Sequence, residues 1–280
     1  MSKQRSRRKM WAEDTLAILE KGYYLNEKGG QIDIYGQQKD AQKGTLVYSP
    51  SQGDEVISNR TPAHFESTQI AVTGESTIEA ILRLIAEGNK DVLALNFASA
   101  KNPGGGFLGG SQAQEESLAR STGLYPTLLK GSPYYEENRK SKSCFYTDYM
   151  IYSPHVPIIK DDNNRYLEEL TLASFITAPA VNTGVIRHRT RGRLGEIEEV
   201  MKRRIAKVLA LAELHGHSTI VLGAWGCGVF QNDPEDIARY FYEVIHKDFG
   251  LSFKKIVFAI YANNDRFITP FKNYFEGDKL

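Results

Sequence analysis

Along most of this chain, short runs of β-branched and apolar residues alternate with segments that have the periodicity of a helix. This alternation limits the possible folds more than any other feature of the sequence. Strands are expected at 68–72, 91–99, 148–160, 172–181 and 254–262, and helices at 11–22, 76–88, 114–129 and 193–216. Residues 218–249 read as a strand, a glycine loop and a helix. The pattern predicts the α/β class, with a mixed sheet covered by helices on both faces.

Residues 23–66 are polar and turn-rich, with weak strand signals at 31–35 and 45–49. No internal repeat and no long biased linker marks a domain boundary. The segment 131–148 is expected to be a surface excursion and not a hinge. The chain therefore reads as one structural domain.

Composition excludes several classes of protein. A chain of 280 residues with 41% hydrophobic content can bury a full core, and its net charge of +1 favours neither a nucleic-acid binder nor an acidic solvating protein. Cys144 and Cys227 are too few for a disulfide framework, so a reducing cytoplasm is expected. No apolar run is long enough for a membrane helix. The basic opening stretch "KQRSRRK" is interpreted as a solvated, frayed terminus, with a weak contact to an anionic partner as the alternative.

Two glycine-rich loops follow expected strands, at 102–110 and at 223–228 ("GAWGCG"). In open α/β sheets, ligands bind beyond the carboxyl ends of the strands. Glycine lets a ligand approach backbone N–H groups closely, and a loop that leads into a helix suits a phosphate. A tight turn is the alternative for one loop alone, but two such loops favour a diphosphate ligand. Neither matches a Walker sequence or a dinucleotide fingerprint.

Glu115 and Glu116 stand side by side at the start of the helix expected after the first glycine loop. As a bare dipeptide they would simply favour the helix dipole. Adjacent helical residues point about 100° apart, so one carboxyl can face the cleft while the other contacts its edge. A carboxyl facing a phosphate-binding cleft beside Phe107 and Leu108 would have a raised pKa, and could donate a proton to a glycosidic oxygen.

The stretch "NFASAKNPGGGFLGGSQAQEESLARSTGLY" resembles the signature of the bacterial-type poly(ADP-ribose) glycohydrolases of the macrodomain superfamily: three glycines, a spacer, then Gln-Glu-Glu. "GAWGCGVF" is similar to the second phosphate loop of that family. The resemblance spans about residues 8–272. It implies a three-layer α/β/α macrodomain with a mixed central sheet at 67–280, and an N-terminal helical extension at 1–66 packed on that core.

The resemblance also implies roles for individual residues. Glu116 is the expected acid/base, and Glu115 is the neighbour that holds ribose hydroxyls. Phe230 is expected to pack over the distal ribose, Tyr261 to lie beside adenine, and Glu75 to meet the adenine amino group. The remaining ADP-ribose contacts that it implies are Gly104, Gly105, Gly106, Gln114, Gly226, Cys227, Gly228, Val229, Asn96 and Ser99.

The expected activity is metal-independent, cofactor-free hydrolysis of the ribose–ribose bond at polymer ends, which releases ADP-ribose. Two alternatives remain: a mono-ADP-ribosyl hydrolase and a non-catalytic ADP-ribose reader. The expected partners are poly(ADP-ribose), or an ADP-ribosylated protein, as substrate and ADP-ribose as product, with no membrane, no sequence-specific nucleic acid and a monomeric state.

Several tempting residues have a plainer interpretation. The histidines show no metal-binding spacing, and His215 and His217 are expected to be exposed or to cap a helix end. Cys227 lacks an activating neighbour, so its small size is expected to matter more than its thiol. The segment "RHRTRGR" (187–193) is interpreted as a solvated loop, with contact to a polymeric anionic substrate as the alternative.

Overall fold

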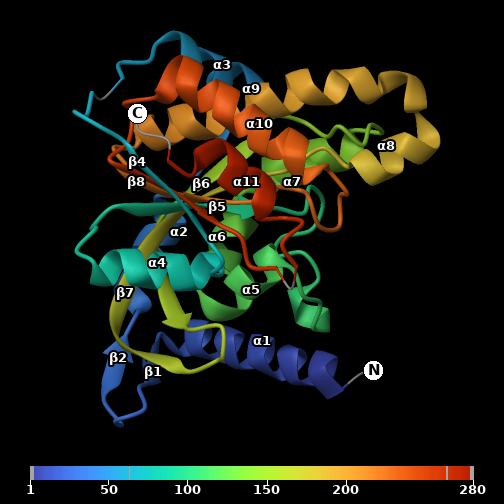
Figure 1. The fold of residues 1–280 in the computed structure, drawn as a ribbon. Helices are drawn as coiled ribbons and strands as arrows, with labels where there is room; N and C mark the ends of the chain where they lie inside the picture. The colour runs from blue at the N-terminus through green and yellow to red at the C-terminus, as the bar shows by residue number, and fades with distance from the viewer. Residues whose placement is uncertain (1–2, 63, 263, 278–280) are drawn as a thin grey trace.

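A seven-stranded mixed sheet forms the centre of the molecule (Figure 1). The computed structural model describes residues 3–62, 64–262 and 264–277. Strand order in the sheet is β3-β6-β7-β5-β8-β9-β4, and a separate two-stranded sheet pairs β1 with β2. The strands are β1 (Tyr23–Leu25), β2 (Gln31–Asp33), β3 (Leu46–Tyr48), β4 (Gln69–Thr73), β5 (Val92–Phe97), β6 (Met150–Lys160), β7 (Tyr166–Ala178), β8 (Thr219–Leu222) and β9 (Lys255–Ala259).

Five neighbouring strands run parallel, and an antiparallel part extends the sheet on one side. β7, β5, β8, β9 and β4 are paired in parallel, whereas β3 with β6 and β6 with β7 are antiparallel. β5 lies near the middle, and five of its six residues are fully buried, as expected for a strand with helices on both faces. The carboxyl ends of β4, β5, β8 and β9 therefore meet at one edge of the sheet.

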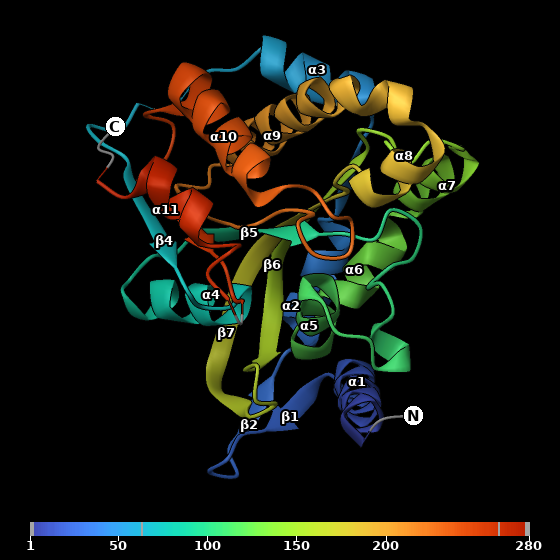
Figure 2. The same cartoon turned by 45° about the vertical axis from the view of Figure 1, so that its right-hand side comes forward.

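Helices cover both faces of the sheet, so the predicted α/β/α layering is confirmed (Figure 2). One hydrophobic cluster joins the sheet to helices on the first face, α9 (Ile197–Leu214), α10 (Pro234–Val244) and α11 (Thr269–Phe275), with α3 (Pro50–Ser58) packed on α9. The second cluster joins it to α2 (Tyr35–Lys43), α4 (Thr77–Ala86), α5 (Gln114–Ser121), α6 (Leu124–Lys130) and α7 (Ser132–Lys140). The remaining helical segments are α1 (Lys3–Lys21), α8 (Thr183–Arg189), the 3₁₀ turns Phe107–Gly109 and Arg191–Glu196, and a π-helical turn at Ile245–Phe249.

Local capping signals in the sequence explain where α4 and α10 begin. Ser76 caps α4 in a capping box with Glu79: the Ser76 side chain accepts from the Glu79 N–H, and the Glu79 carboxylate accepts from the Ser76 N–H. Asp233 caps α10, with Pro234 in its first turn. No helix in the described part of the chain is long and apolar enough to cross a membrane.

The structure corrects three expectations about the chain's organisation. The basic opening stretch is not a frayed terminus, because α1 is already helical at Lys3. The helix expected at 114–129 is two helices, broken where the Gln38 side chain occupies the space beside Gly123. The segment 131–148 is more than a surface excursion, since α7 buries Tyr134 and Tyr135 in the core.

His215 is the C-cap residue of α9, as one of the two expectations had it, but neither His215 nor His217 is exposed. The ring of His215 stacks on Tyr152 with centroids 3.5 Å apart and bonds the Tyr48 hydroxyl at 2.8 Å. His217 is buried between the Tyr152 hydroxyl and the Asp91 carbonyl. Burial lowers the pKa of His215 to about 4, so both rings serve packing.

The antiparallel edge bears on the predicted division of the chain at residue 66. β3 pairs with β6, so residues 46–48 belong to the central sheet itself. α2 also packs on β6. This pairing is consistent with the expectation of one structural domain. The boundary at residue 66 between an N-terminal extension and the core stays a prediction.

Candidate active site

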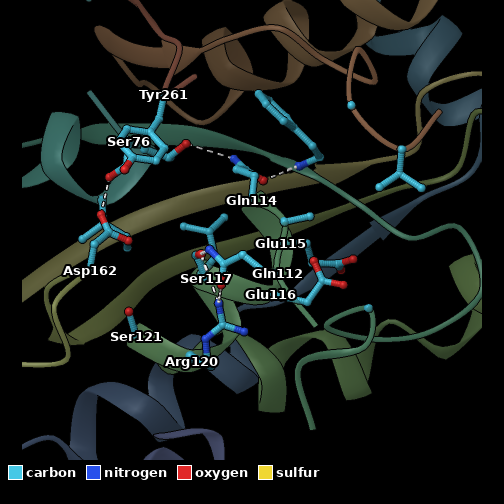
Figure 3. Close-up of a pocket in the computed structure, with 18 of the residues that line it drawn as sticks. Ser76, Gln112, Gln114, Glu115, Glu116, Ser117, Arg120, Ser121, Asp162 and Tyr261 are labelled. Atoms are coloured by element: carbon cyan, nitrogen blue, oxygen red, sulfur yellow. Dashed lines mark hydrogen bonds between the residues drawn. The ribbon is translucent and has the colours of Figure 1, made fainter. Parts of the chain in front are cut away.

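A cavity of about 1400 Å³ opens at the edge where the parallel strands end. The segments after β4, β5, β8 and β9 contribute to its lining, and α1 closes one side. This is the position at which open α/β sheets bind their ligands. Figure 3 shows Glu115 and Glu116 together at the start of α5, with Ser76 and Asp162 facing each other elsewhere in the cavity.

The glycine loop after β5 brings two carboxyl groups against the backbone. Gly104 and Gly105 have φ of +68° and +59°, a conformation that favours glycine. A Cβ on Gly105 would lie 2.5 Å from Glu116 Oε1 and 3.2 Å from Glu115 Oε2. Both carboxyls therefore converge on one glycine, and this close approach explains why glycines and paired glutamates occur together in the sequence.

Glu116 is the carboxylate that the loop holds in the cavity. It is half-buried and lines the cavity, and its Oε1 accepts a hydrogen bond of 3.0 Å from the Gly106 N–H. Within the described residues, Oε2 has no hydrogen bond of its own. Glu116 thus presents one carboxyl oxygen to a ligand from a fixed position.

Glu115 borders the cavity but is almost completely buried, and its surroundings favour its neutral form. Its side chain is 3% exposed, and it accepts hydrogen bonds from the Ser99 N–H at 2.6 Å and from Asn96 Nδ2 at 3.5 Å. Burial, assisted by the nearby charge of Glu116, raises the pKa of Glu115 to about 8. The pKa that is raised is therefore that of Glu115. Of the two apolar neighbours expected from the sequence, Phe107 packs against Tyr125 and Leu108 is exposed, and neither lines the cavity.

Gln114 uses its amide to fasten α5 to the central strand. Its Oε1 accepts from the Phe97 N–H at 2.8 Å, and its Nε2 donates to the Leu95 carbonyl at 2.8 Å and to Thr77 at 3.1 Å. These bonds fix the register of the helix start against β5. Although Gln114 lines the cavity, its polar atoms are already occupied, which favours a positioning role for it.

The two other predicted residues near β5 lie at different depths. Asn96 is fully buried and donates to Thr177 at 3.1 Å, behind the cavity wall. Ser99 lines the cavity, and its N–H is the donor that holds Glu115. Asn96 therefore does not border the cavity itself, and it acts on the site only through its hydrogen bond to Glu115.

The second glycine loop forms the opposite wall. Gly226 has φ +76°, and a Cβ there would lie 2.4 Å from Asn232 Nδ2 and 2.5 Å from Ala180 Cβ. Gly226, Gly228, Val229 and Phe230 line the cavity. The Val229 side chain is 77% exposed, so the tip of the loop is open to a ligand.

Cys227 lies behind this wall and does not line the cavity. Burial raises the pKa of its thiol well above the ordinary value. The interpretation of Cys227 as a small buried residue therefore fits its surroundings. Cys144 and Cys227 are both free thiols.

Of the two residues expected near adenine, Tyr261 lines the cavity and Glu75 does not. Tyr261 follows β9, lines the cavity and is 74% exposed, so its ring is available to a ligand. Glu75 is not among the lining residues: its carboxylate forms an ion pair of 2.6 Å with Arg83 and accepts from Thr73. Contact of Glu75 with adenine stays a prediction that would require this pair to rearrange.

Sequence reasoning missed the arginine one helical turn after the glutamates. Arg120 lines the cavity and donates to the Ser111 carbonyl at 2.7 Å and to the Gln112 side chain. Burial lowers its pKa to about 10, an effect that the charge of Glu116 opposes. The i, i+4 spacing from Glu116 to Arg120 was the signal that could have identified it.

The predicted basic loop at 187–193 lies apart from the cavity. It forms the end of α8 and the start of a 3₁₀ turn, and its residues are exposed. Arg193 pairs with Glu196 at 2.6 Å. None of the residues of this segment lines the cavity.

Solved structures of known proteins match the chain closely. The poly(ADP-ribose) glycohydrolase (PARG) of Thermomonospora curvata is 39% identical, with a TM-score of 0.92, over 96% of this chain and 100% of that one. The same enzyme bound to the inhibitor ADP-HPD matches at 40% identity and 0.89, over 96% and 99%. PARG from Deinococcus radiodurans in complex with ADP-ribose matches at 40% identity and 0.82, over 86% and 97%. The macrodomain architecture that the sequence resemblance implies is thereby confirmed.

A comparison with curated proteins gives no significant match. Residues 12–161, which include the first glycine loop and both glutamates, match the model of the microbial-type PARG catalytic domain. With more than half the chain matched and the fold shared over nearly its full length, this protein belongs to the microbial-type PARG family.

Proposed function

We propose that the protein is a poly(ADP-ribose) glycohydrolase that hydrolyses the ribose–ribose O-glycosidic bond at polymer ends and releases ADP-ribose. The observation that carries this proposal is the convergence of the Glu115 and Glu116 carboxyls on Gly105 in a large cavity between two glycine loops. The relatives solved with ADP-ribose and with ADP-HPD support ADP-ribose as the ligand class.

In this proposal Glu116 performs the proton transfers. Its protonated carboxyl donates to the 2′-oxygen of the departing unit while the bond from that oxygen to the ribose carbon breaks. The resulting oxocarbenium-like ribose then accepts a water molecule, which gives its proton to the Glu116 carboxylate. The acid is thereby regenerated and ADP-ribose is released. The hydrogen bond from the Gly106 N–H supports this role because it fixes the carboxyl throughout.

Glu115 is proposed to set the charge and orientation of its neighbour. With a pKa of about 8 it holds its proton near neutral pH, so it places no negative charge beside the Glu116 carboxyl. A neutral carboxyl also has an O–H to donate to a ribose hydroxyl. Its bonds to Ser99 and Asn96 support this position.

The two loops are proposed to bind the rest of the ligand. The backbone of Gly104–Gly106 and of Gly226–Gly228 would accommodate the ribose and diphosphate, with Phe230 over the distal ribose and Tyr261 beside adenine. The positive φ angles of Gly104, Gly105 and Gly226 support this arrangement. Because the carboxyl supplies both proton transfers, we propose that no metal takes part, and EDTA should leave the activity unchanged.

Hydrolysis assays on two substrates test the function. Purified protein is incubated with poly(ADP-ribose) and, separately, with mono-ADP-ribosylated protein, and free ADP-ribose is quantified. We expect release from the polymer. Glu116→Gln keeps the size of the side chain but lacks the acidic proton, so its rate should fall by about 10²-fold to 10⁴-fold.

ADP-ribose affinity separates catalysis from binding in the same variant. Calorimetry with Glu116→Gln should give an affinity close to that of the wild type, because the proton is needed chiefly in the transition state. Near-normal hydrolysis by this variant would move the acid to another residue. Loss of affinity in step with activity would make Glu116 a binding or folding residue.

We further propose a monomer that acts in the reducing cytoplasm. The two free thiols support the reducing compartment. Sedimentation of the purified protein with and without ADP-ribose tests the oligomeric state, and a dimer would overturn it.

A further inference from the structure

One face of α1 lines the cavity. Gln4, Arg7, Arg8 and Trp11 belong to the lining, and their spacing of i, i+3, i+4 and i+7 places them on one side of the helix. Surface helices ordinarily carry apolar residues at this spacing and bury them. Here the stripe is polar, cationic and aromatic, and the core-facing residues of α1 are others (Ala12, Thr15 and Ile18).

Contacts with the first glycine loop (residues 102–110) fix α1 in this position. Arg5 Nε donates to the Gly109 carbonyl at 2.8 Å and Arg8 Nε to the Gly110 carbonyl at 2.9 Å. Gly110 has φ +73°, and a Cβ there would lie 2.2 Å from the Arg5 carbonyl oxygen. The basic face is therefore held at the cavity by the same loop that leads into α5 and its glutamates.

No carboxylate among the described residues neutralises the guanidinium groups on this face. Within the described residues, neither Arg7 nor Arg8 forms an ion pair with a carboxylate. The exposed Arg7 stacks over the Trp11 ring at 4.9 Å, which restricts its rotamers. A planar guanidinium held in place matches the geometry of a phosphate.

Acidic residues on the facing turn after β6 do not cancel this charge. Asp161 is paired with Arg165 at 2.7 Å. Asp162 is hydrogen-bonded by the Ser76 hydroxyl, and burial raises the pKa of its carboxyl. The α1 side of the cavity thus keeps its positive charge.

The size of the cavity indicates that one ADP-ribose does not fill it. At about 1400 Å³ it exceeds the roughly 300–1,000 Å³ of most small-ligand sites. Poly(ADP-ribose) carries a diphosphate on every unit. We infer that the Arg7–Arg8–Trp11 face of α1 is a second substrate subsite, which binds the diphosphate of the polymer unit next to the one held in the catalytic cleft. This inference rests on the proposed function and adds a determinant of chain-length preference, on residues that precede the family match at 12–161.

Charge reversal at Arg7 tests the subsite. Arg7→Glu is compared with the wild type, with Arg7→Lys, and with Lys9→Glu, which makes the same charge change on α1 at a residue outside the cavity lining. The substrates are long poly(ADP-ribose) and an ADP-ribose that carries a small phenol leaving group at the scissile carbon. Rates are measured over a range of salt concentrations.

We expect Arg7→Glu to raise KM for the polymer by about tenfold at low salt and to flatten its salt dependence, because a phosphate contact is lost. Turnover of the phenol substrate and affinity for free ADP-ribose should not change. Arg7→Lys should recover most of the polymer affinity, and Lys9→Glu should behave like the wild type. Equal losses on both substrates, or no loss on the polymer, would overturn the subsite.

Two further measurements keep the claims separate. A wild type that hydrolyses neither substrate refutes the proposed function. The subsite is then decided by polymer binding, which Arg7→Glu should weaken while binding of ADP-ribose stays unchanged. A single-stranded oligonucleotide is the competitor: if Arg7→Glu loses oligonucleotide binding but keeps polymer binding, the face binds nucleic acid and the inference is wrong.

Discussion

Replacing Glu115 by glutamine should change how the stability of the protein depends on pH. In the folded protein the pKa of Glu115 is about 8, against an ordinary value of 4.5. Between these two values the folded state binds more protons than the unfolded state, so the free energy of unfolding falls as the pH rises. The stabilising effect of the bound proton is complete below about pH 4.5 and is lost as the pH passes through about 8.

The magnitude follows from the size of the shift. Each pKa unit corresponds to about 1.4 kcal/mol, and integration of the linkage relation from about pH 5 to about pH 7 gives a loss of about 2 kcal/mol from this group. Because Glu115 is 3% exposed, solvent screening does little to reduce this value. Glu115→Gln has no titrating group there, so this part of the pH dependence should vanish.

Urea unfolding at several pH values provides the assay. The wild type, Glu115→Gln and the surface control Glu136→Gln are compared, with Glu136 exposed on α7. Between about pH 5 and about pH 7, the free energy of unfolding of the wild type should fall by about 2 kcal/mol more than that of Glu115→Gln. This change with pH is what is compared, so a constant difference in stability between the two proteins does not affect the result. Glu136→Gln should run parallel to the wild type. A Glu115→Gln curve that also runs parallel would refute the assignment of a raised pKa to Glu115.

Two glycine substitutions test the loops. Gly226→Val should lower ADP-ribose affinity by about tenfold or more in calorimetry, because at φ +76° its side chain would collide with Asn232 and Ala180. Gly192→Val is the control, because a Cβ on Gly192 has no atom within 4 Å. If Gly226→Val binds normally, that loop does not hold the diphosphate. Gly110→Ala should lower the free energy of unfolding by about 1–3 kcal/mol, since its Cβ would meet the Arg5 carbonyl oxygen 2.2 Å away. Gly109→Ala, whose nearest contact is the end of the Arg5 side chain at 3.7 Å, should cost less, and equal losses would contradict the close packing of α1.

The parts of the fold that could be predicted from sequence are those whose signals are local. β5 is a run of buried apolar residues, and the two glycine loops follow their strands directly. The start of α4 is specified by Ser76 and Glu79, three positions apart. Such features depend on neighbours within a few residues, so periodicity and capping suffice to find them.

The parts that could not be predicted depend on contacts between distant positions. The hydrogen bond from Arg8 to Gly110 joins residues 102 positions apart, and nothing in a basic terminus indicates such a partner. The break between α5 and α6 involves Gln38, which lies 85 positions before Gly123. The raised pKa of Glu115 likewise follows from its burial, which the dipeptide alone does not reveal.

The position of β4 has a consequence for the order in which the protein is built. β4 is the edge strand of the parallel part of the sheet, and its partner is β9, the last strand of the chain. As the chain leaves the ribosome, residues 69–73 must therefore wait until residues 255–259 have been synthesised before they can pair. Such long-range pairing slows folding and leaves strand edges unpaired in the meantime. Because the loops after β4 and β9 both border the cavity, a nascent chain cannot complete the cavity until its C-terminal strand has joined the sheet.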